Sequence, residues 1–108
     1  MSDIPTFGLS RRTIELLTGA LARFPRIAEA RIFGSRSMGN FKNGSDIDLA
    51  LFGPELDESS VRKLSTLLNE ELPIPHHVDV VWYEACENEE LKSHIREHGR
   101  RIESSETR

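Results

Sequence analysis

Cysteine is almost absent from this chain, since Cys86 is the single one among 108 residues. One cysteine excludes an intramolecular disulfide and fits a reducing compartment. No apolar run approaches the roughly 18–20 residues that a membrane-spanning helix needs, and the segment Met1–Pro5 lacks the basic flank and apolar stretch of a signal peptide. We therefore expect a cytoplasmic protein with no membrane partner.

A strong excess of positive charge is also lacking, because the formal net charge is −4. This balance argues against direct nucleic-acid binding. The charges are nevertheless placed unevenly: residues 1–45 carry seven Lys or Arg and three acids, whereas residues 46–108 carry seven Lys or Arg and fifteen acids. A basic half could steer a polyphosphate while an acidic half supplies metal ligands, although solvated acidic helix faces explain the same pattern.

The length fits a single domain over 1–108, with an irregular lead-in over 1–9 and a frayed end over 104–108. Apolar periodicity and turn residues predict helices and strands in the order α-β-β-α-β-α. The helices are expected over 10–24, 57–72 and 87–97, the strands over 28–33, 46–52 and 77–83, and a further short strand over 100–103. We expect an α/β (α+β) fold, a small mixed sheet whose helices cover one face.

Two aspartates alternate with apolar residues at the start of the second predicted strand, in the run Ser45-Asp46-Ile47-Asp48-Leu49. Side chains alternate between the faces of a strand, so Asp46 and Asp48 point the same way, about 7 Å apart. Carboxylates held together in this way repel each other unless a cation lies between them. Oxygen ligands of this kind suit Mg²⁺, which accepts one or two carboxylates together with substrate phosphates.

A third aspartate, Asp79, lies between Val78 and Val80 in the third predicted strand. A lone carboxylate in an apolar strand is costly unless it is paired or binds a metal. If the second and third strands are neighbours, three carboxylates meet at one place and could hold two Mg²⁺ ions against a phosphate undergoing in-line displacement. Asp79 would then lie nearest the attacking hydroxyl and help to remove its proton.

A small turn, Gly34-Ser35, ends the first predicted strand, and ten residues separate it from Asp46. Glycine lets the backbone approach a ligand closely, and free N–H groups at a helix start bind anions. Arg36 is near enough in sequence to neutralise phosphate charge. We therefore expect Gly34, Ser35, Arg36 and Ser45 to bind a nucleoside triphosphate.

Other motifs are incomplete. Gly34 to Gly39 has the glycine spacing of a P-loop, but Asn40-Phe41 follows where Lys and Ser or Thr are required. The run Asp46-Ile47-Asp48 lacks the third ligand and the glycine of a calcium-binding loop. The pair His76-His77 lies in a proline-bracketed turn and is a poor metal site.

Together, Phe33-Gly34-Ser35, Asp46-Ile47-Asp48 and Val78-Asp79-Val80 resemble the minimal nucleotidyltransferases of the DNA polymerase β superfamily. The resemblance implies a polymerase-β-like fold and ATP as the substrate. It also implies that Gly34 and Ser35 hold the triphosphate, that Asp46 and Asp48 bind two Mg²⁺ ions, and that Asp79 completes the catalytic-metal site.

Minimal members of this group typically act as antitoxins to a small all-helical HEPN ribonuclease toxin, and some transfer AMP from ATP to a tyrosine of that toxin. The resemblance therefore implies a protein adenylyltransferase with a HEPN partner, in a homo- or hetero-oligomer. Two alternatives stay open: a non-catalytic module that neutralises a helical partner by contact, and a small-molecule nucleotidyltransferase built from two chains.

Overall fold

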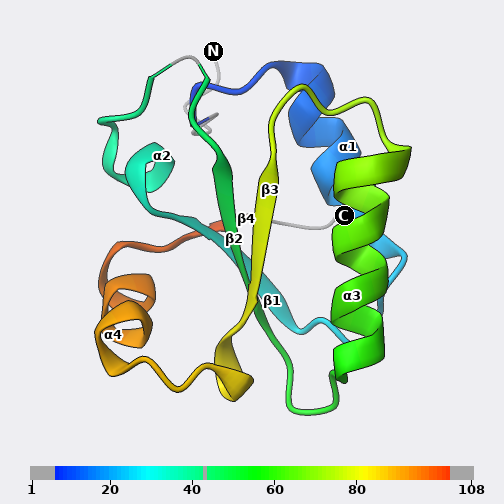
Figure 1. Ribbon diagram of the computed structural model, residues 1–108, viewed down its shortest axis with the longest axis vertical. Coiled ribbons are helices and arrows are strands. Elements are labelled where there is room, and N and C mark those ends of the chain that lie inside the picture. Colours follow the sequence, from blue (N-terminus) through cyan, green and yellow to red (C-terminus); the bar gives the residue numbers. More distant parts are fainter. Residues whose placement is uncertain (1–6, 43, 103–108) are drawn as a thin grey trace.

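The computed structural model describes residues 7–42 and 44–102, and these form a twisted sheet between two layers of helices (Figure 1). The predicted order of elements is present, with a short helix added before the second strand. Within the described residues, none of the helices has the length and apolar character needed to cross a membrane. In chain order the elements are α1 (Arg11–Ala22), β1 (Glu29–Phe33), α2 (Ser35–Met38), β2 (Ile47–Phe52), α3 (Glu58–Thr66), the π-helical turn η1 (Leu67–Glu71), β3 (Val78–Trp82), the 3₁₀ turn η2 (Tyr83–Ala85), α4 (Glu89–His98) and β4 (Arg100–Ile102).

The sheet has the strand order β3-β2-β1-β4, so β2 and β1 are central and β3 and β4 lie at the edges. β1 pairs with β2 and with β4 in antiparallel fashion, whereas β2 and β3 are parallel. The parallel pair places Asp48 directly opposite Asp79. The expected mixed sheet, with the second and third strands as neighbours, is therefore confirmed.

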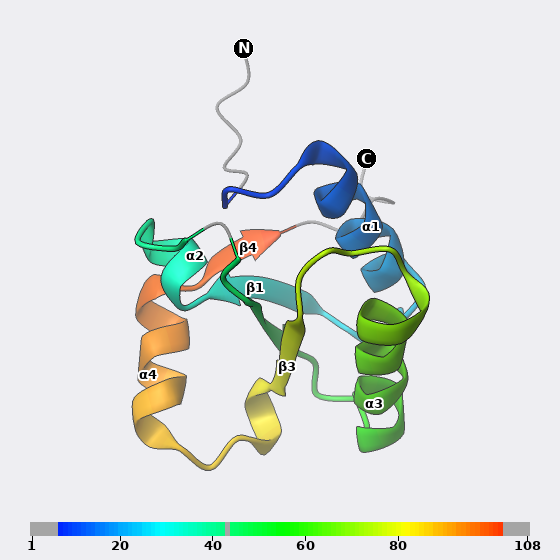
Figure 2. The same ribbon diagram turned by 45° about the horizontal axis from the view of Figure 1, so that its top comes forward.

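One face of the sheet is covered by α1 and α3 (Figure 2). Ile47, Leu49 and Leu51 alternate along β2 and are completely buried against leucines of these helices. Phe7 and Leu9 from the lead-in are buried in the same cluster, while the predicted tail over 104–108 lies outside the described residues. The period-two pattern of β2 therefore fixes which face carries the main core.

The sequence predicted that helices cover only one face of the sheet, but the other face is also partly covered. α4 packs there, and its Ile95 is buried with Phe33 of β1 and Ala50 of β2. Leu91 adds a partly buried contact to the same cluster. The prediction of helices on one face is therefore correct for α1 and α3 but not for α4. Leu91 and Ile95 form an apolar stripe on α4, and this stripe is buried by packing against the second face of the sheet.

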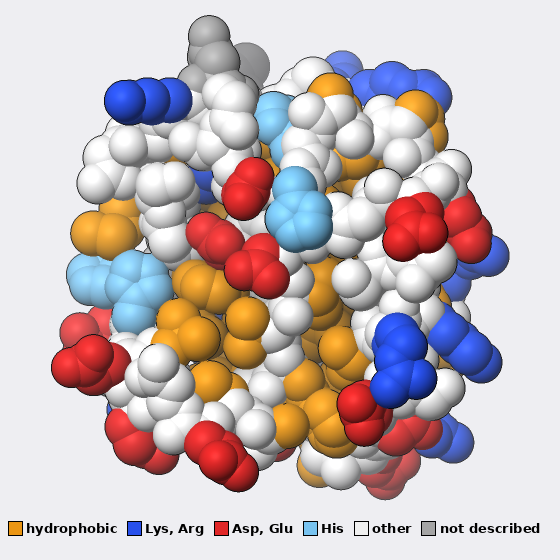
Figure 3. Space-filling view, viewed as in Figure 1, with side chains coloured by type: hydrophobic (Ala, Val, Ile, Leu, Met, Phe, Trp, Pro, Cys, Tyr) orange, Lys and Arg blue, Asp and Glu red, His pale blue; other side chains and the backbone are white. Residues whose placement is uncertain are grey.

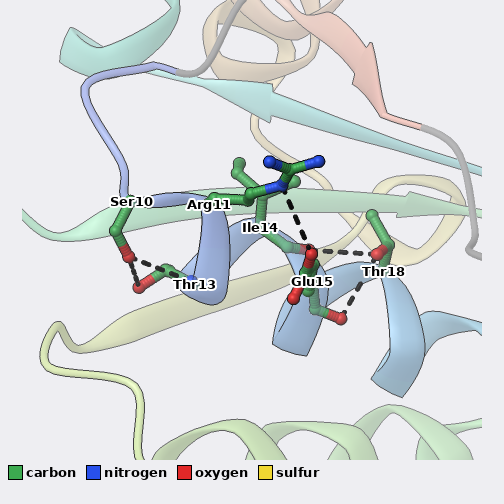
Figure 4. A network of polar contacts seen from close by, with 6 residues as sticks. All are labelled: Ser10, Arg11, Thr13, Ile14, Glu15 and Thr18. Carbon is green, nitrogen blue, oxygen red and sulfur yellow. Dashed lines mark hydrogen bonds and ion pairs between the residues drawn. The ribbon is translucent and has the colours of Figure 1, made fainter.

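Ser10 caps the start of α1, as predicted, and its side chain accepts a hydrogen bond of 3.1 Å from the Thr13 N–H (Figure 4). The Ser10 hydroxyl donates to Thr13 Oγ1 at 3.0 Å, and the Thr18 hydroxyl donates to the Ile14 carbonyl at 3.0 Å. A serine cap satisfies one of the N–H groups that a helix start leaves unpaired. The exposed pair of Arg11 and Glu15 adds little to this.

Asp57 caps α3, at the start of the range predicted for the second long helix, but the last turn of this helix is π-helical rather than α-helical. This turn places Asn69 beside the start of β3. The Asn69 amide donates to the Val78 carbonyl at 2.9 Å and its side-chain oxygen accepts from the Val78 N–H at 2.8 Å. Asn69 thus takes the place of a neighbouring strand and ties α3 to the edge of the sheet.

We expect Asn69→Leu to lower the free energy of unfolding by about 1–3 kcal/mol, because two partly buried backbone groups of Val78 lose their partners. Urea unfolding followed by circular dichroism measures the effect. Asn40→Leu, at an exposed asparagine in the loop after α2, is the control and should change stability by less than about 0.5 kcal/mol. Equal stability of the two variants would contradict the proposed strand-like role of Asn69.

Candidate functional site

The predicted carboxylates gather where β2 and β3 run side by side. Asp48 is half-buried in β2, and Asp79 is exposed on the neighbouring edge strand directly opposite it. Asp46 is exposed immediately before β2. The space-filling view shows acidic side chains close together over these strands, next to histidine side chains (Figure 3). The fold therefore places the three acids at one end of the β2–β3 pair.

The charges of these acids act on one another. The pKa of Asp48 is raised above its usual value, first because burial disfavours the charged form and then because the carboxylates of Asp79 and Asp46 are close. His94 and His77 lower the pKa again, but by less than the combined increase. The site thus carries a negative charge that the protein itself only partly compensates, which is the electrostatic setting of a cation site.

The chemistry of the donors fits Mg²⁺, although the described residues do not form a complete metal cage. Over residues 7–42 and 44–102, no group of three or more His, Cys, Asp or Glu side chains is arranged to hold a metal ion. Mg²⁺ usually binds to one or two carboxylates and takes its remaining ligands from water and substrate phosphates. The Asp48–Asp79 pair supplies oxygen donors of that kind, so the residues fit a site that a polyphosphate would complete.

Gly34 connects β1 to α2 and lies against Asp48. Its backbone has φ +76° and ψ −151°, a combination that is essentially limited to glycine. A Cβ atom at this position would overlap Asp48 Oδ2. The glycine therefore allows the end of β1 to approach the central carboxylate. Ser35 follows as the first residue of α2, so its backbone N–H has no partner within that helix.

Arg36 points inward, away from the surface where the sequence predicted a phosphate contact. Only 2% of its surface is exposed. Its guanidinium donates to the Ser45 carbonyl at 2.9 and 3.2 Å and to the Phe7 carbonyl at 2.8 Å, and it lies over the Phe41 ring. The Ser45 hydroxyl accepts from the Lys42 N–H at 2.8 Å. Arg36 and Ser45 therefore hold the loop that leads to Asp46 in place.

The sequence analysis missed His94, a residue of α4. Its Nε2 accepts a hydrogen bond of 3.1 Å from the Gly34 N–H, and its ring meets the Phe33 ring edge-on at 6.0 Å. In the sequence His94 lies three residues after Leu91, and residues three apart share a helix face. That signal becomes readable only once α4 is known to cover the second face of the sheet.

A family model described as "Polymerase beta, Nucleotidyltransferase" matches residues 15–108. The chain belongs to this family. The match covers the whole sheet and every predicted site residue, so the family that the motifs resemble is confirmed. A search of curated proteins gives no match to this nucleotidyltransferase.

Several solved structures share the fold of this nucleotidyltransferase. A chain of a toxin–antitoxin crystallised with AMP-PNP has a TM-score of 0.67 and 23% identity, with 91% of this chain and 77% of that chain covered. A mutant of the toxin–antitoxin MntA-HpeT has a TM-score of 0.66 and 23% identity, covering 90% and 74%. A complex of a tri-AMPylated Shewanella oneidensis HEPN toxin with an MNT antitoxin has a TM-score of 0.58 and 19% identity, covering 86% and 74%. These likenesses confirm the polymerase-β-like fold.

Gly34→Ala should destabilise the domain more than Gly39→Ala does. Both glycines have a positive φ, but a Cβ on Gly39 meets no atom within 4 Å, whereas one on Gly34 overlaps Asp48. We expect a cost of about 1–2 kcal/mol at Gly39 from the backbone alone, and roughly 1–3 kcal/mol more at Gly34 from overlap. Urea unfolding in EDTA measures both, and equal costs would show that Gly34 does not need to approach Asp48 closely.

Asp48→Asn should stabilise the metal-free protein at neutral pH. Because the pKa of Asp48 is raised in the folded state, the wild type loses stability as the pH rises from the unfolded-state pKa through the folded-state pKa. The gain from Asn should therefore be present at pH 7 and fade below about pH 4.

Asp57→Asn is the matched control, because the Ser60 N–H lowers the pKa of this capping carboxylate. The ionised Asp57 carboxylate stabilises the folded state, so its effect on stability has the opposite sign to that of Asp48. This stabilisation is present above the unfolded-state pKa and is lost as the pH falls through the folded-state pKa. Urea unfolding between pH 3 and 8 in EDTA compares both variants with the wild type. An Asp48→Asn variant that is less stable than the wild type at pH 7 would contradict the combined cost of burial and of repulsion at Asp48.

Proposed function

We propose that this chain is a Mg²⁺-dependent nucleotidyltransferase that moves AMP from ATP to a hydroxyl group, that of a tyrosine, on a small all-helical HEPN partner. The transfer would make it an antitoxin. The observation that carries the proposal is the placement of Asp48 opposite Asp79, next to the Gly34-Ser35 turn, in a chain of the nucleotidyltransferase family.

Different residues of the site bind the triphosphate, hold the metal ions and support the loop before Asp46. Gly34 and Ser35 bind the triphosphate, because the first N–H groups of a helix lack partners within it. Asp46, Asp48 and Asp79 would hold two Mg²⁺ ions, which, when bound, neutralise phosphate charge and favour an ionised hydroxyl. Arg36 and Ser45 support the site by shaping the loop before Asp46.

The reaction forms one bond and breaks one at the α-phosphorus. The acceptor oxygen bonds to the α-phosphorus, the bond to the bridging oxygen breaks, and pyrophosphate leaves. Asp79 accepts the proton of the acceptor hydroxyl. This role suits its position, since Asp79 is exposed on an edge strand where a partner protein can reach it.

The solved structures with the same fold support the choice of partner and donor. They include a toxin–antitoxin with AMP-PNP and an AMPylated HEPN toxin in complex with its MNT antitoxin. A partner is also favoured by the site itself, because Asp46 and Asp79 are exposed at one end of β2 and β3, where acidic side chains lie on the surface (Figure 3).

The test is intact-mass spectrometry of a co-expressed HEPN partner after incubation with ATP and Mg²⁺. We expect the partner to gain one or more AMP units with the wild type and none with Asp46→Asn/Asp48→Asn. The matched control, Glu55→Gln/Glu70→Gln, removes two exposed acids outside the site and should leave transfer within about twofold of the wild type.

Other outcomes identify the alternatives. A partner silenced without any mass gain, by the wild type and the double Asn variant alike, would show a non-catalytic module that acts by contact. Label on a soluble compound and none on the protein would show a small-molecule nucleotidyltransferase built from two chains. Wild-type transfer by the folded double Asn variant would overturn the role of the carboxylates.

A further inference from the structure

We propose that His94 is a positioning residue for the triphosphate, because it holds the backbone of the Gly34-Ser35 turn from the α4 side. The inference rests on the proposed nucleotidyltransferase function. It assigns a role to a residue that lies sixty positions beyond the turn and forms no part of the glycine-serine and aspartate motifs.

The two peptide groups on either side of the Gly34 Cα are held by different helices. The carbonyl of Gly34 accepts from the Ser37 hydroxyl at 2.9 Å and from the Met38 N–H at 3.2 Å, both in α2. The N–H of Gly34 donates to His94 Nε2 in α4 at 3.1 Å. α2 thus fixes one peptide plane, and His94 fixes the other.

Both planes need to be held, because glycine moves freely between backbone regions that are closed to other residues. The peptide whose carbonyl α2 holds also contains the Ser35 N–H, on its opposite side. The direction of that N–H depends on the torsion angles at Gly34, and His94 restrains the torsion angle φ. A loose Gly34 would therefore spread the Ser35 N–H over several directions and weaken its hydrogen bond to a phosphate.

His94 is itself well fixed. Its ring meets the edge of Phe33 at 6.0 Å and lies 5.1 Å from the His98 ring, measured between centroids. The next residue, Ile95, is fully buried in the second core cluster. The Gly34 N–H points at Nε2, so Nε2 is the accepting atom of this contact. His94 therefore acts on the turn as an acceptor on a rigid support.

Three variants separate the hydrogen bond from the packing. His94→Phe keeps a ring against Phe33 but has no acceptor. His94→Gln places an amide oxygen close to the position of Nε2 and can accept from the Gly34 N–H. His98→Phe is the matched control, because it makes the same histidine-to-phenylalanine change at an exposed position of α4 and keeps a ring beside His94.

The measurements are binding of AMP-PNP with Mg²⁺ by isothermal titration calorimetry, and the KM and kcat of AMP transfer. We expect His94→Phe to raise the dissociation constant and the KM for ATP about three- to tenfold, the worth of one hydrogen bond, with kcat within about twofold. His94→Gln and His98→Phe should stay within about twofold of the wild type. Circular dichroism verifies that each variant is folded.

Each result has one meaning. If the wild type binds AMP-PNP and His94→Phe binds it equally well, the positioning role is overturned while the proposed function stands. Equal weakening by His94→Gln and His94→Phe would also overturn it, because the acceptor would then not matter. A wild type that neither binds AMP-PNP nor transfers AMP overturns the proposed function, and the role of His94 with it. If His94→Phe does not fold, His94→Leu replaces it with the same expected results.

Discussion

Two carboxylates on neighbouring strands repel each other, and the fold keeps Asp48 and Asp79 side by side in spite of this repulsion. The register is fixed by the opposite face of the strands, where Ile47, Leu49 and Val78 are buried. A slip of one residue would move these side chains to the exposed face, at a cost of about 1.5–3 kcal/mol each. The apolar core therefore holds an electrostatically unfavourable arrangement in place, and the site exists because the core is stronger than the repulsion.

The turn at Gly34 depends on the same carboxylate. Since a Cβ atom would overlap Asp48 Oδ2, the end of β1 can lie against the acid only without a side chain. The flexibility that comes with glycine is then removed by α2 and α4, which hold the two flanking peptides. α4 therefore contributes in two ways: it buries the second apolar cluster, and its His94 accepts the hydrogen bond from the Gly34 N–H.

Most of the fold could be predicted from local patterns, and so could the acids. The alternation of Ile47, Leu49 and Leu51 identifies the buried face of β2, and Ser10 marks the start of α1. Both signals arise from neighbouring residues, so no knowledge of the tertiary structure is needed. The family motifs predict the candidate acids in the same way, although their assembly at one place depends on the parallel pairing of β2 with β3.

The remaining features depend on contacts between distant parts of the chain. An arginine directly after a glycine-serine turn suggests a phosphate contact, but Arg36 points inward because the carbonyls of Phe7 and Ser45 lie within its reach. Likewise, nothing near His94 in the sequence shows that α4 lies on the second face of the sheet. The π-helical turn and the contact of Asn69 with Val78 depend on how α3 meets β3. Local periodicity contains no information on any of these.

The contact of Asn69 with Val78 also affects how this protein behaves at high concentration. β3 is an edge strand, and a row of unpaired N–H and C=O groups along such an edge is a template for strand addition by another molecule. Asn69 already occupies the outward-facing groups of Val78, and the strand ends at Trp82, where the chain turns into η2. The open part of this edge is therefore very short, which protects the domain from intermolecular β-pairing while Asp79 stays accessible to a partner.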